Sequence, residues 1–259
     1  MALKQKRRII VLCDRYLRSD ELNRLRPLLE SRDYNIIGCL VDDRPNKPYL
    51  LKLWESVKRG RGMYSLVVIF KLVFSAPKIY DSKGVIRDYG IRLLQAKNPY
   101  KTENLKRIRK LRPDAMVLIN GFGIVKKELI NASNGILSLH GGDMRKYRGL
   151  SCGFWAIYNG ETEMVLTVQN MDYGIDNGTP IIEKRIPLKK TDSLKDLHLK
   201  CQPHLHNIFI EALDKFFSAD FQPKKIERFG RLHTLPTSLE WSIFWLKLFY
   251  RRFFSLFAS

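Results

Sequence analysis

Within residues 135–182, an apolar strand ends on a histidine, and an aspartate lies in the loop that follows a later strand. The apolar residues Ile136, Leu137 and Leu139 predict a buried strand that leads directly into His140. A Gly-Gly pair and a basic turn follow it, and Asp176 comes 36 residues after His140. Histidine and carboxylate side chains at strand ends and in loops are typical of acid–base chemistry.

Apolar runs alternate with helical patterns along the rest of the chain. Strands are expected at residues 8–14, 35–41, 90–96, 115–119, 136–139, 163–171 and 180–188, and helices at 20–32, 50–74, 102–111, 126–131 and 193–217. Pro203 is expected to break the last of these helices. Buried strands joined by helices predict an α/β fold with a mostly parallel twisted sheet flanked by helices. No G-x-G-x-x-G pattern follows the first strand, so the dinucleotide fingerprint is absent.

Polar residues end several of the predicted strands. Asp14, Asp42, Asn120 and His140 all stand at carboxyl ends. In a doubly wound sheet, ligands bind outside these ends, so the active cleft is expected there.

Five matched elements in order carry a resemblance to the folate-dependent formyltransferases. They are the strand-histidine, the K-Y-R-G turn, the A-I-x-x-G helix, the D-x-G-x-D-x-G-x-x-I loop and the Gly-rich segment 121–125. The resemblance implies a Rossmann-like formyltransferase fold and 10-formyltetrahydrofolate as co-substrate. It also implies that His140 and Asp176 lie together as catalytic residues, with the aspartate orienting the imidazole.

One catalytic position departs from the family pattern. The family motif is N-x-H, and this chain has Ser138 two residues before His140. A carboxamide N–H stabilises the oxygen that becomes negative during acyl transfer, and loss of one such donor costs about 100- to 1,000-fold in rate. Asn120 is a candidate replacement, or it simply turns the chain before Gly121. A catalytically impaired homologue that binds a ligand or partner is the alternative.

The resemblance also assigns binding residues. Phe122, Gly123, Ile124 and Asp172 are expected to bind the folate. Gly141, Gly142, Tyr147 and Arg148 are expected to shape the substrate site; the two glycines allow close backbone approach.

Charge and cysteine usage limit the partners and the compartment. The formal net charge of +20 indicates a polyanionic partner: nucleic acid, an anionic membrane surface or an anionic small-molecule substrate. No nucleic-acid-binding motif supports the first of these. The four cysteines have no C-x-x-C spacing, so we expect buried free thiols and no metal site. The apolar run 9–13 is too short for a signal peptide, so we expect a cytoplasmic location, with peripheral membrane contact as an option.

The last forty residues differ from the rest in composition. We therefore divide the chain into a catalytic domain (1–218) and a basic-aromatic C-terminal extension (219–259) with a helix at 241–257. This helix is expected either to adsorb to anionic lipid, with Lys247 and Arg251 toward the phosphates, or to pack on residues 63–74 within one subunit or across a homodimer. The tRNA enzymes of the family carry a further domain of about 100 residues. A nucleotide-linked amino sugar used in surface polysaccharide assembly is therefore the favoured acceptor.

Overall fold

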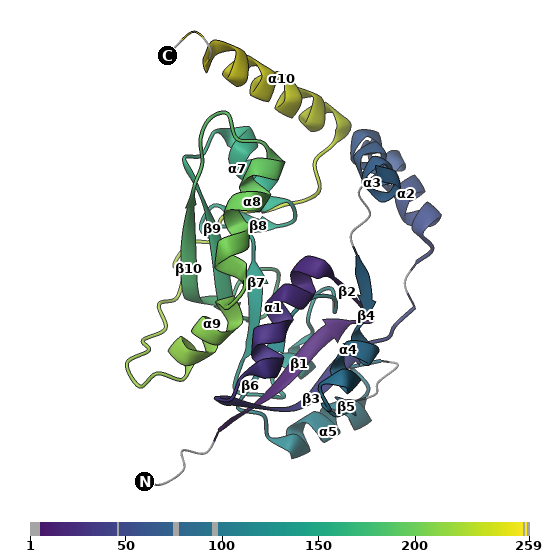
Figure 1. The fold of residues 1–259 in the computed structure, drawn as a ribbon, viewed down its shortest axis with the longest axis vertical. Helices are drawn as coiled ribbons and strands as arrows, with labels where there is room; N and C mark the ends of the chain where they lie inside the picture. Colours follow the sequence, from purple (N-terminus) through teal and green to yellow (C-terminus); the bar gives the residue numbers. More distant parts are fainter. Residues whose placement is uncertain (1–5, 46, 75–77, 95–97, 256, 258–259) are drawn as a thin grey trace.

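A seven-stranded sheet forms the centre of the protein in the computed structural model (Figure 1). The model describes residues 6–45, 47–74, 78–94, 98–255 and 257. In chain order the strands of the sheet are β1 (Arg7–Asp14), β3 (Tyr34–Asp42), β5 (Leu93–Leu94), β6 (Ala115–Leu118), β7 (Ile136–His140), β9 (Glu163–Asn170) and β10 (Thr179–Pro187). Their order in space is β10-β9-β7-β6-β1-β3-β5, and only β9 runs antiparallel to its neighbours. The predicted α/β fold with a mostly parallel sheet is confirmed.

Helices cover both faces of this sheet, because successive side chains of a strand point to opposite sides. Ile9, Val11 and Cys13 of β1 face one cluster, and Ile10 and Leu12 face another; all five are fully buried. The first cluster includes side chains of α1 (Ser19–Glu30), α7 (Cys152–Asn159), α8 (Leu194–Leu205) and α9 (Ile208–Phe216). The second is closed by α5 (Thr102–Leu111) and α6 (Lys127–Ile130).

The register brings the polar strand ends to one edge of the sheet. Asp14 at the end of β1 is paired with Asp42 at the end of β3. On the other side, β6 pairs with β7 up to Ser138, and His140 is opposite Thr167 of β9.

Three predicted boundaries need correction. The apolar segment 50–74 forms two helices, α2 (Tyr49–Lys58) and α3 (Gly62–Phe74), because the chain turns at Gly60 with a φ of 71°. In the predicted strand 90–96 only Leu93–Leu94 pairs with β3, and residues 95–97 lie outside the described residues. Pro203 lies within the last turn of α8, so the helix ends after Leu205 rather than at the proline.

Two short strand pairs and a helix surround the main sheet. An antiparallel pair, β2 (Tyr16–Arg18) with β4 (Ile79–Asp81), precedes α4 (Ser82–Asp88). A parallel pair joins β8 (Tyr147–Gly149) to β11 (Arg231–His233). The last helix is α10 (Ser238–Ser255), so the C-terminal region is helical as predicted. Because β11 pairs with β8, and Trp241, Phe244 and Leu248 of α10 belong to the main core, the described part of residues 219–259 is packed on the rest of the protein. The separation of this segment as a unit stays a prediction.

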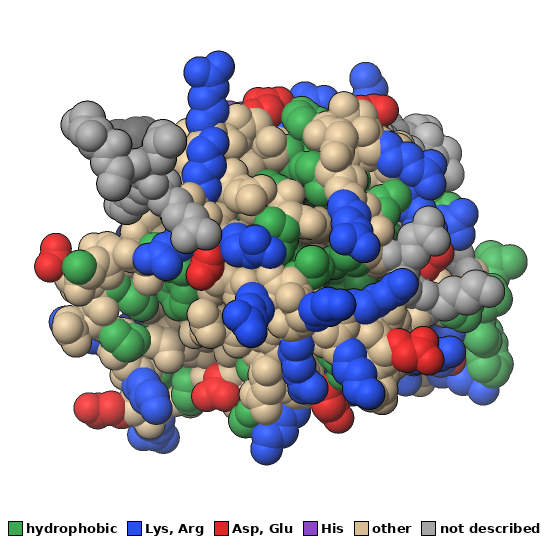
Figure 2. Space-filling model, turned by 90° about the horizontal axis from the view of Figure 1, so that it is seen from below, with side chains coloured by type: hydrophobic (Ala, Val, Ile, Leu, Met, Phe, Trp, Pro, Cys, Tyr) green, Lys and Arg blue, Asp and Glu red, His purple; other side chains and the backbone are tan. Residues whose placement is uncertain are grey.

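Lys and Arg side chains cover the end of the molecule opposite α10 (Figure 2). The exposed residues Lys106, Arg107, Arg109 and Lys110 of α5 belong to this end. The high positive charge is therefore spread well beyond the strand-end edge.

Candidate active site

His140 and Asp176 lie in contact at the carboxyl end of β7. His140 Nδ1 lies 3.3 Å from Asp176 Oδ2, and the imidazole is buried. The other ring nitrogen, Nε2, lies 2.9 Å from the backbone carbonyl oxygen of Tyr147. Both nitrogens face oxygen acceptors, and a neutral ring can donate to only one of them. The structure thus joins two residues that are 36 positions apart in the sequence.

The backbone and a neighbouring amide fix the Asp176 carboxylate. Asp176 has a φ of 48°, a left-handed conformation that aspartate tolerates better than most residues. Its Oδ2 accepts the Gly149 N–H at 2.8 Å, and its Oδ1 accepts the Gln169 side-chain N–H at 3.1 Å. Two donors besides His140 therefore hold this carboxylate toward the imidazole.

Gln169 is a site residue that the sequence analysis did not identify. It lies on β9 directly opposite Ser138 of β7. Only 2% of Gln169 is exposed; its Oε1 accepts the Gly178 N–H at 2.9 Å, and one hydrogen on Nε2 binds Asp176. Within the described part of the chain, the second hydrogen on Nε2 has no acceptor. Buried Ser138 and Gln169 therefore place a carboxamide donor beside the catalytic strand.

Asn120 is held by contacts at the end of β6. Its side-chain oxygen accepts the Asp14 N–H at 2.8 Å. Its amide nitrogen donates to the Tyr16 carbonyl at 3.0 Å and to Glu21 Oε2 at 2.8 Å. Both donor hydrogens are used in fixing β2 and α1, so a catalytic donor role for Asn120 requires these bonds to break and stays a prediction.

We expect Asn120→Ala to lower the free energy of unfolding by about 1 kcal/mol, because it leaves a partly buried polar network without its central amide. Urea denaturation followed by circular dichroism measures this change. Unchanged stability together with a large loss of turnover would instead support the catalytic role.

Gly142 stands where a side chain would strike the catalytic histidine. A Cβ at this position would lie 2.8 Å from Cys152 Cβ and 3.0 Å from His140 Nε2. At Gly141 the nearest atom to an added Cβ is Met164 Cε at 3.7 Å, an ordinary contact. The Gly142 carbonyl also accepts a hydrogen bond from the Thr167 hydroxyl at 3.0 Å. Only the second glycine is sterically required.

Gly142→Ala should therefore displace His140 or Cys152 and destabilise the fold by about 1–3 kcal/mol, as overpacking typically does. Gly141→Ala is the matched control, since the same methyl group meets no close neighbour there. Thermal denaturation of the two variants compares them directly; equal melting temperatures would contradict the contact.

Tyr147 and Arg148 shape the site through hydrogen bonds to neighbouring residues of the protein. The Tyr147 hydroxyl donates to Glu161 at 2.9 Å, and burial together with Glu161 raises its pKa to about 12. Tyr147 thus offers the site its backbone carbonyl, while its phenol stays neutral. Arg148 donates to the carbonyls of Gly230 and Ile175 and to the side chain of Asn177, which ties the Asp176 loop to β11. Direct substrate contact by either side chain stays a prediction.

Cys152 is a second residue near the histidine that its sequence context did not reveal. Its Sγ lies 3.6 Å from His140 Nε2, at the first residue of α7. Burial, assisted by the negative charge of Asp176, raises the pKa of this thiol to about 12. Cys152 therefore stays protonated beside the imidazole and adds no charge to the site.

The loop 121–125 exposes backbone groups that suit a folate ring. Gly121, Phe122 and Gly123 all have positive φ values, of 77°, 62° and 58°. Phe122 anchors the loop because its side chain is buried, and Ile124 is 64% exposed. Among the described residues, the N–H groups of residues 122–125 make no hydrogen bond. This loop can therefore pair its backbone with the polar edge of a pterin, as the resemblance implies for Phe122, Gly123 and Ile124.

Arg44 supports the same loop from β3. It donates to the Phe122 carbonyl at 3.1 Å and forms an ion pair with Asp42 at 2.5 Å. Burial opposes ionisation of Asp42, but hydrogen bonds from Arg44 outweigh it and hold the pKa of Asp42 below its usual value. Arg44 Cζ also lies 5.2 Å from the centre of the Tyr100 ring. The predicted Asp42 strand end is thus a support for the loop.

Asp172 lines a different hollow. Its carboxylate accepts the Tyr173 N–H at 2.7 Å, and Tyr173 donates to Asn131 after α6. The surrounding polar cavity has a volume of about 300 Å³ and is lined in part by Ser133, Asn134 and Asn170. It lies beside Gly135, where β7 begins, so Asp172 lies near the opposite end of that strand from His140. Its folate contact stays a prediction.

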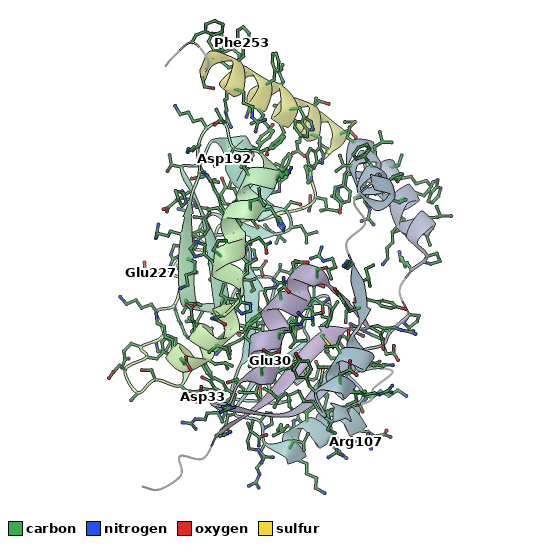
Figure 3. All side chains as sticks on the ribbon, viewed as in Figure 1. Glu30, Asp33, Arg107, Asp192, Glu227 and Phe253 are labelled. Atoms are coloured by element: carbon green, nitrogen blue, oxygen red, sulfur yellow. The ribbon has the colours of Figure 1, made fainter. Side chains whose placement is uncertain are left out.

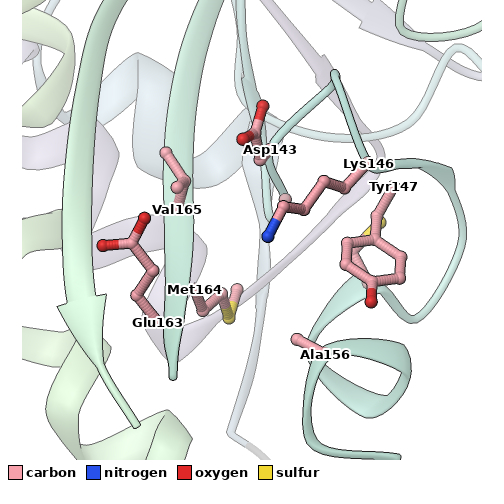
Figure 4. A pocket seen from close by; sticks show the side chains of 9 residues that line it. Asp143, Lys146, Tyr147, Ala156, Glu163, Met164 and Val165 are labelled. Carbon is pink, nitrogen blue, oxygen red and sulfur yellow. The ribbon is translucent and has the colours of Figure 1, made fainter. Parts of the chain in front are cut away.

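A small cavity behind the histidine loop cannot hold a substrate (Figure 4). It is lined by Gly142, Cys152 and the labelled residues Asp143, Lys146, Tyr147, Ala156, Glu163, Met164 and Val165. Its volume is about 10 Å³, the space of a single water molecule. This cavity is therefore not a substrate site, and the strand-end edge stays the predicted one.

Comparison with known proteins places this site in a family. Residues 59–213 match the family model described as formyl transferase, so the chain belongs to the formyl transferases, a family of enzymes. The methionyl-tRNA formyltransferase of Citrifermentans bemidjiense is 29% identical over 202 residues, which are 78% of this chain and 56% of that protein. The chain thus spans about half the length of the curated relatives it matches.

Solved structures share the fold at low sequence identity. A sugar N-formyltransferase from Shewanella sp. FDAARGOS_354 has a TM-score of 0.59 and 14% identity, covering 93% of this chain and 87% of that one. Glycinamide ribonucleotide transformylase 1 from Symbiobacterium toebii has a TM-score of 0.57 and 17% identity, covering 86% and 95%. HypX from Aquifex aeolicus, in complex with tetrahydrofolic acid, has a TM-score of 0.52 and 16% identity, covering 86% and 29%.

Proposed function

We propose that this protein transfers the formyl group of 10-formyltetrahydrofolate to the amino group of a nucleotide-linked amino sugar. The observation that carries the proposal is the His140–Asp176 pair at a strand end, 3.3 Å apart. The family membership supports formyl transfer. The sugar N-formyltransferase of similar fold and the net charge of +20, which suits a phosphorylated acceptor, support the acceptor class.

The roles of the residues follow from the chemistry of formyl transfer. Bound 10-formyltetrahydrofolate supplies the formyl group, and the backbone of Phe122, Gly123 and Ile124 would hold its ring. When the acceptor amine attacks, a C–N bond forms and the nitrogen must lose a proton. The neutral His140 ring takes this proton on Nε2, once Nε2 leaves its contact with the Tyr147 carbonyl, and returns it to the leaving nitrogen as the original C–N bond breaks. Asp176 holds Nδ1 and stabilises the charged ring.

The negative charge that develops on the formyl oxygen needs a hydrogen-bond donor as well. Ser138 stands where the family pattern has asparagine, and the carboxamide of Gln169 belongs to the residue directly opposite Ser138 on the paired strand. Its second amide hydrogen is free to donate to the developing oxyanion, within the described structure. Gln169 is therefore the residue to which we assign the asparagine's task.

The acceptor is tested with a panel. Purified protein is incubated with 10-formyltetrahydrofolate and amino-sugar nucleotides, glycinamide ribonucleotide or methionyl-tRNA, and release of tetrahydrofolate is followed spectroscopically. Mass spectrometry of the product then locates the formyl group. Turnover with methionyl-tRNA alone would overturn the amino-sugar acceptor and favour the function named for the curated relatives; no turnover with any amine would favour an impaired, ligand-binding homologue.

A further inference from the structure

Helix α10 has one covered face and one exposed apolar face. Trp241, Phe244 and Leu248 are buried, and the rings of Trp241 and Phe244 lie 4.8 Å from that of Phe154 in α7. The other side of the helix exposes large apolar residues: Leu239, Trp245, Leu246, Phe249, Tyr250, Phe253 and Phe254, each between 46% and 69% exposed. Phe253 projects outward at the upper end of the molecule (Figure 3). An exposed aromatic surface of this extent marks an interaction site.

The basic residues of α10 do not belong to this exposed face. Lys247 Nζ donates to the Tyr158 carbonyl at 3.1 Å, and Arg251 donates to the Ile157 carbonyl at 2.8 Å. These are carbonyls at the end of α7, where cations are favoured. The expectation that Lys247 and Arg251 meet lipid phosphates is therefore wrong. They attach α10 to the body and so direct its aromatic residues outward.

The α2–α3 hairpin contacts the start of α10 and has exposed apolar residues of its own. The Ser238 N–H donates to the Gly60 carbonyl at 2.8 Å, and the Met63 N–H donates to Ser238 Oγ at 3.1 Å. Figure 1 shows the hairpin meeting this end of α10. Its exposed apolar residues are Leu50, Leu51, Trp54, Val57, Leu66, Ile69 and Phe70. Contact of α10 with residues 63–74, which the sequence offered as an alternative to lipid, thus occurs alongside a large exposed face.

We propose that this combined surface, α10 with the α2–α3 hairpin, docks on an anionic phospholipid bilayer. Phe, Trp and Tyr are the side chains that anchor helices at the interface of a bilayer. Residues 47–61 add five basic residues against one acidic residue, and Lys58 Nζ lies 3.5 Å from the centre of the exposed Trp54 ring. Over the described residues, no helix is long and apolar enough to cross a bilayer, so the surface lies on the membrane.

Charge favours a bilayer over a second copy of the chain as the occupant. Each copy carries a net charge of +20, so two copies repel each other, whereas an anionic leaflet attracts the protein.

Docking would also fix the position of the active site. The Tyr147 carbonyl contacts His140, and β8, which contains Tyr147, pairs with β11. Only residues 234–237 separate β11 from α10, and the Thr234 carbonyl accepts the Trp155 indole N–H at 3.0 Å. A bilayer under α10 would therefore hold the catalytic edge at a set orientation to its surface.

Vesicle co-sedimentation tests the proposal. The full chain should bind vesicles of phosphatidylglycerol and phosphatidylcholine, bind less with rising salt, and bind pure phosphatidylcholine weakly. Phe249→Ser combined with Phe253→Ser should weaken binding by about tenfold or more. Leu199→Ser is the matched control, because Leu199 is 57% exposed and belongs to α8, outside α10 and the α2–α3 hairpin. Bound protein should show a blue shift of tryptophan fluorescence from Trp54 and Trp245.

A second pair of variants guards against misfolding. Lys58→Glu with Arg59→Glu changes only exposed side chains of the hairpin and should weaken binding to phosphatidylglycerol by about tenfold. Absence of binding at low salt, or equal binding to neutral vesicles, would overturn the proposal. So would a dimer in analytical ultracentrifugation that Phe249→Ser with Phe253→Ser converts to monomer, since a second copy would then cover the face.

Discussion

His140→Ala and Asp176→Ala should each lower the rate of formyl transfer by about 10²- to 10⁴-fold, the range supplied by a positioned acid–base group. His140 is the group that can move the proton of the attacking amine. Asp176 holds its Nδ1 at 3.3 Å and is itself held by Gly149 and Gln169. Single-turnover release of tetrahydrofolate, with the best acceptor of the panel, measures the loss.

Asp176→Asn separates orientation from charge. The amide preserves the shape of the loop but can present a donor to Nδ1, which favours the wrong tautomer of the ring. We expect a loss close to that of Asp176→Ala with a smaller loss of stability. Circular dichroism and thermal denaturation should show folded proteins in all three cases. Near-wild-type turnover of either alanine variant would remove the catalytic assignment and leave the pair as a structural contact.

The fold could be predicted because its strands bury both faces. An apolar run such as Ile9 to Cys13 is buried completely, so its sequence carries the signal of a central parallel strand. The ends of the helices were harder to predict. The turn at Gly60, for example, lies inside a segment whose apolar residues continue on both sides. The local hydrophobic pattern thus identified the helices and strands but missed the turns that divide one apolar segment into two helices.

Site residues could be predicted where the residue type and motif indicated the role. They could not be predicted where the role depends on which other residue the side chain contacts. His140 and Asp176 were identified from the motif. Asn120 has the right carboxamide at a strand end, but only the structure shows that Asp14, Tyr16 and Glu21 use it. Gln169 stood in a strand without any motif that marked it, because its task depends on the register with Ser138.

The exposed face of α10 shows the same limit. Apolar residues nearly encircle this helix in the sequence, so its covered side could not be identified from the pattern alone. The bonds of Lys247 and Arg251 to the end of α7 decide which side packs. Charged residues that looked like a lipid-binding stripe are instead attachments to the protein.

Substitutions at Ser138 and Gln169 should give the second large effect on turnover. Gln169→Met keeps the volume of the side chain and removes its amide, so it should lower turnover by about 10²- to 10³-fold, the cost of one oxyanion donor. Ser138→Asn alone should preserve or raise turnover, because it restores the family's donor two residues before His140. In the Gln169→Met background, Ser138→Asn should recover at least about tenfold of the loss.

A double-mutant cycle makes this coupling measurable. If the two carboxamides serve one task, the effect of Ser138→Asn will be much larger with Met at position 169 than with Gln, and the two changes will not add. Additive effects would mean that Gln169 acts only by holding Asp176 and Gly178, through its bonds of 3.1 and 2.9 Å. Loss of activity in a folded Ser138→Asn protein would show instead that the serine has a task of its own. Since Ser138 is buried between Leu118 and Gln169 in the register, melting temperatures of all four proteins are needed to separate a packing cost from a catalytic one.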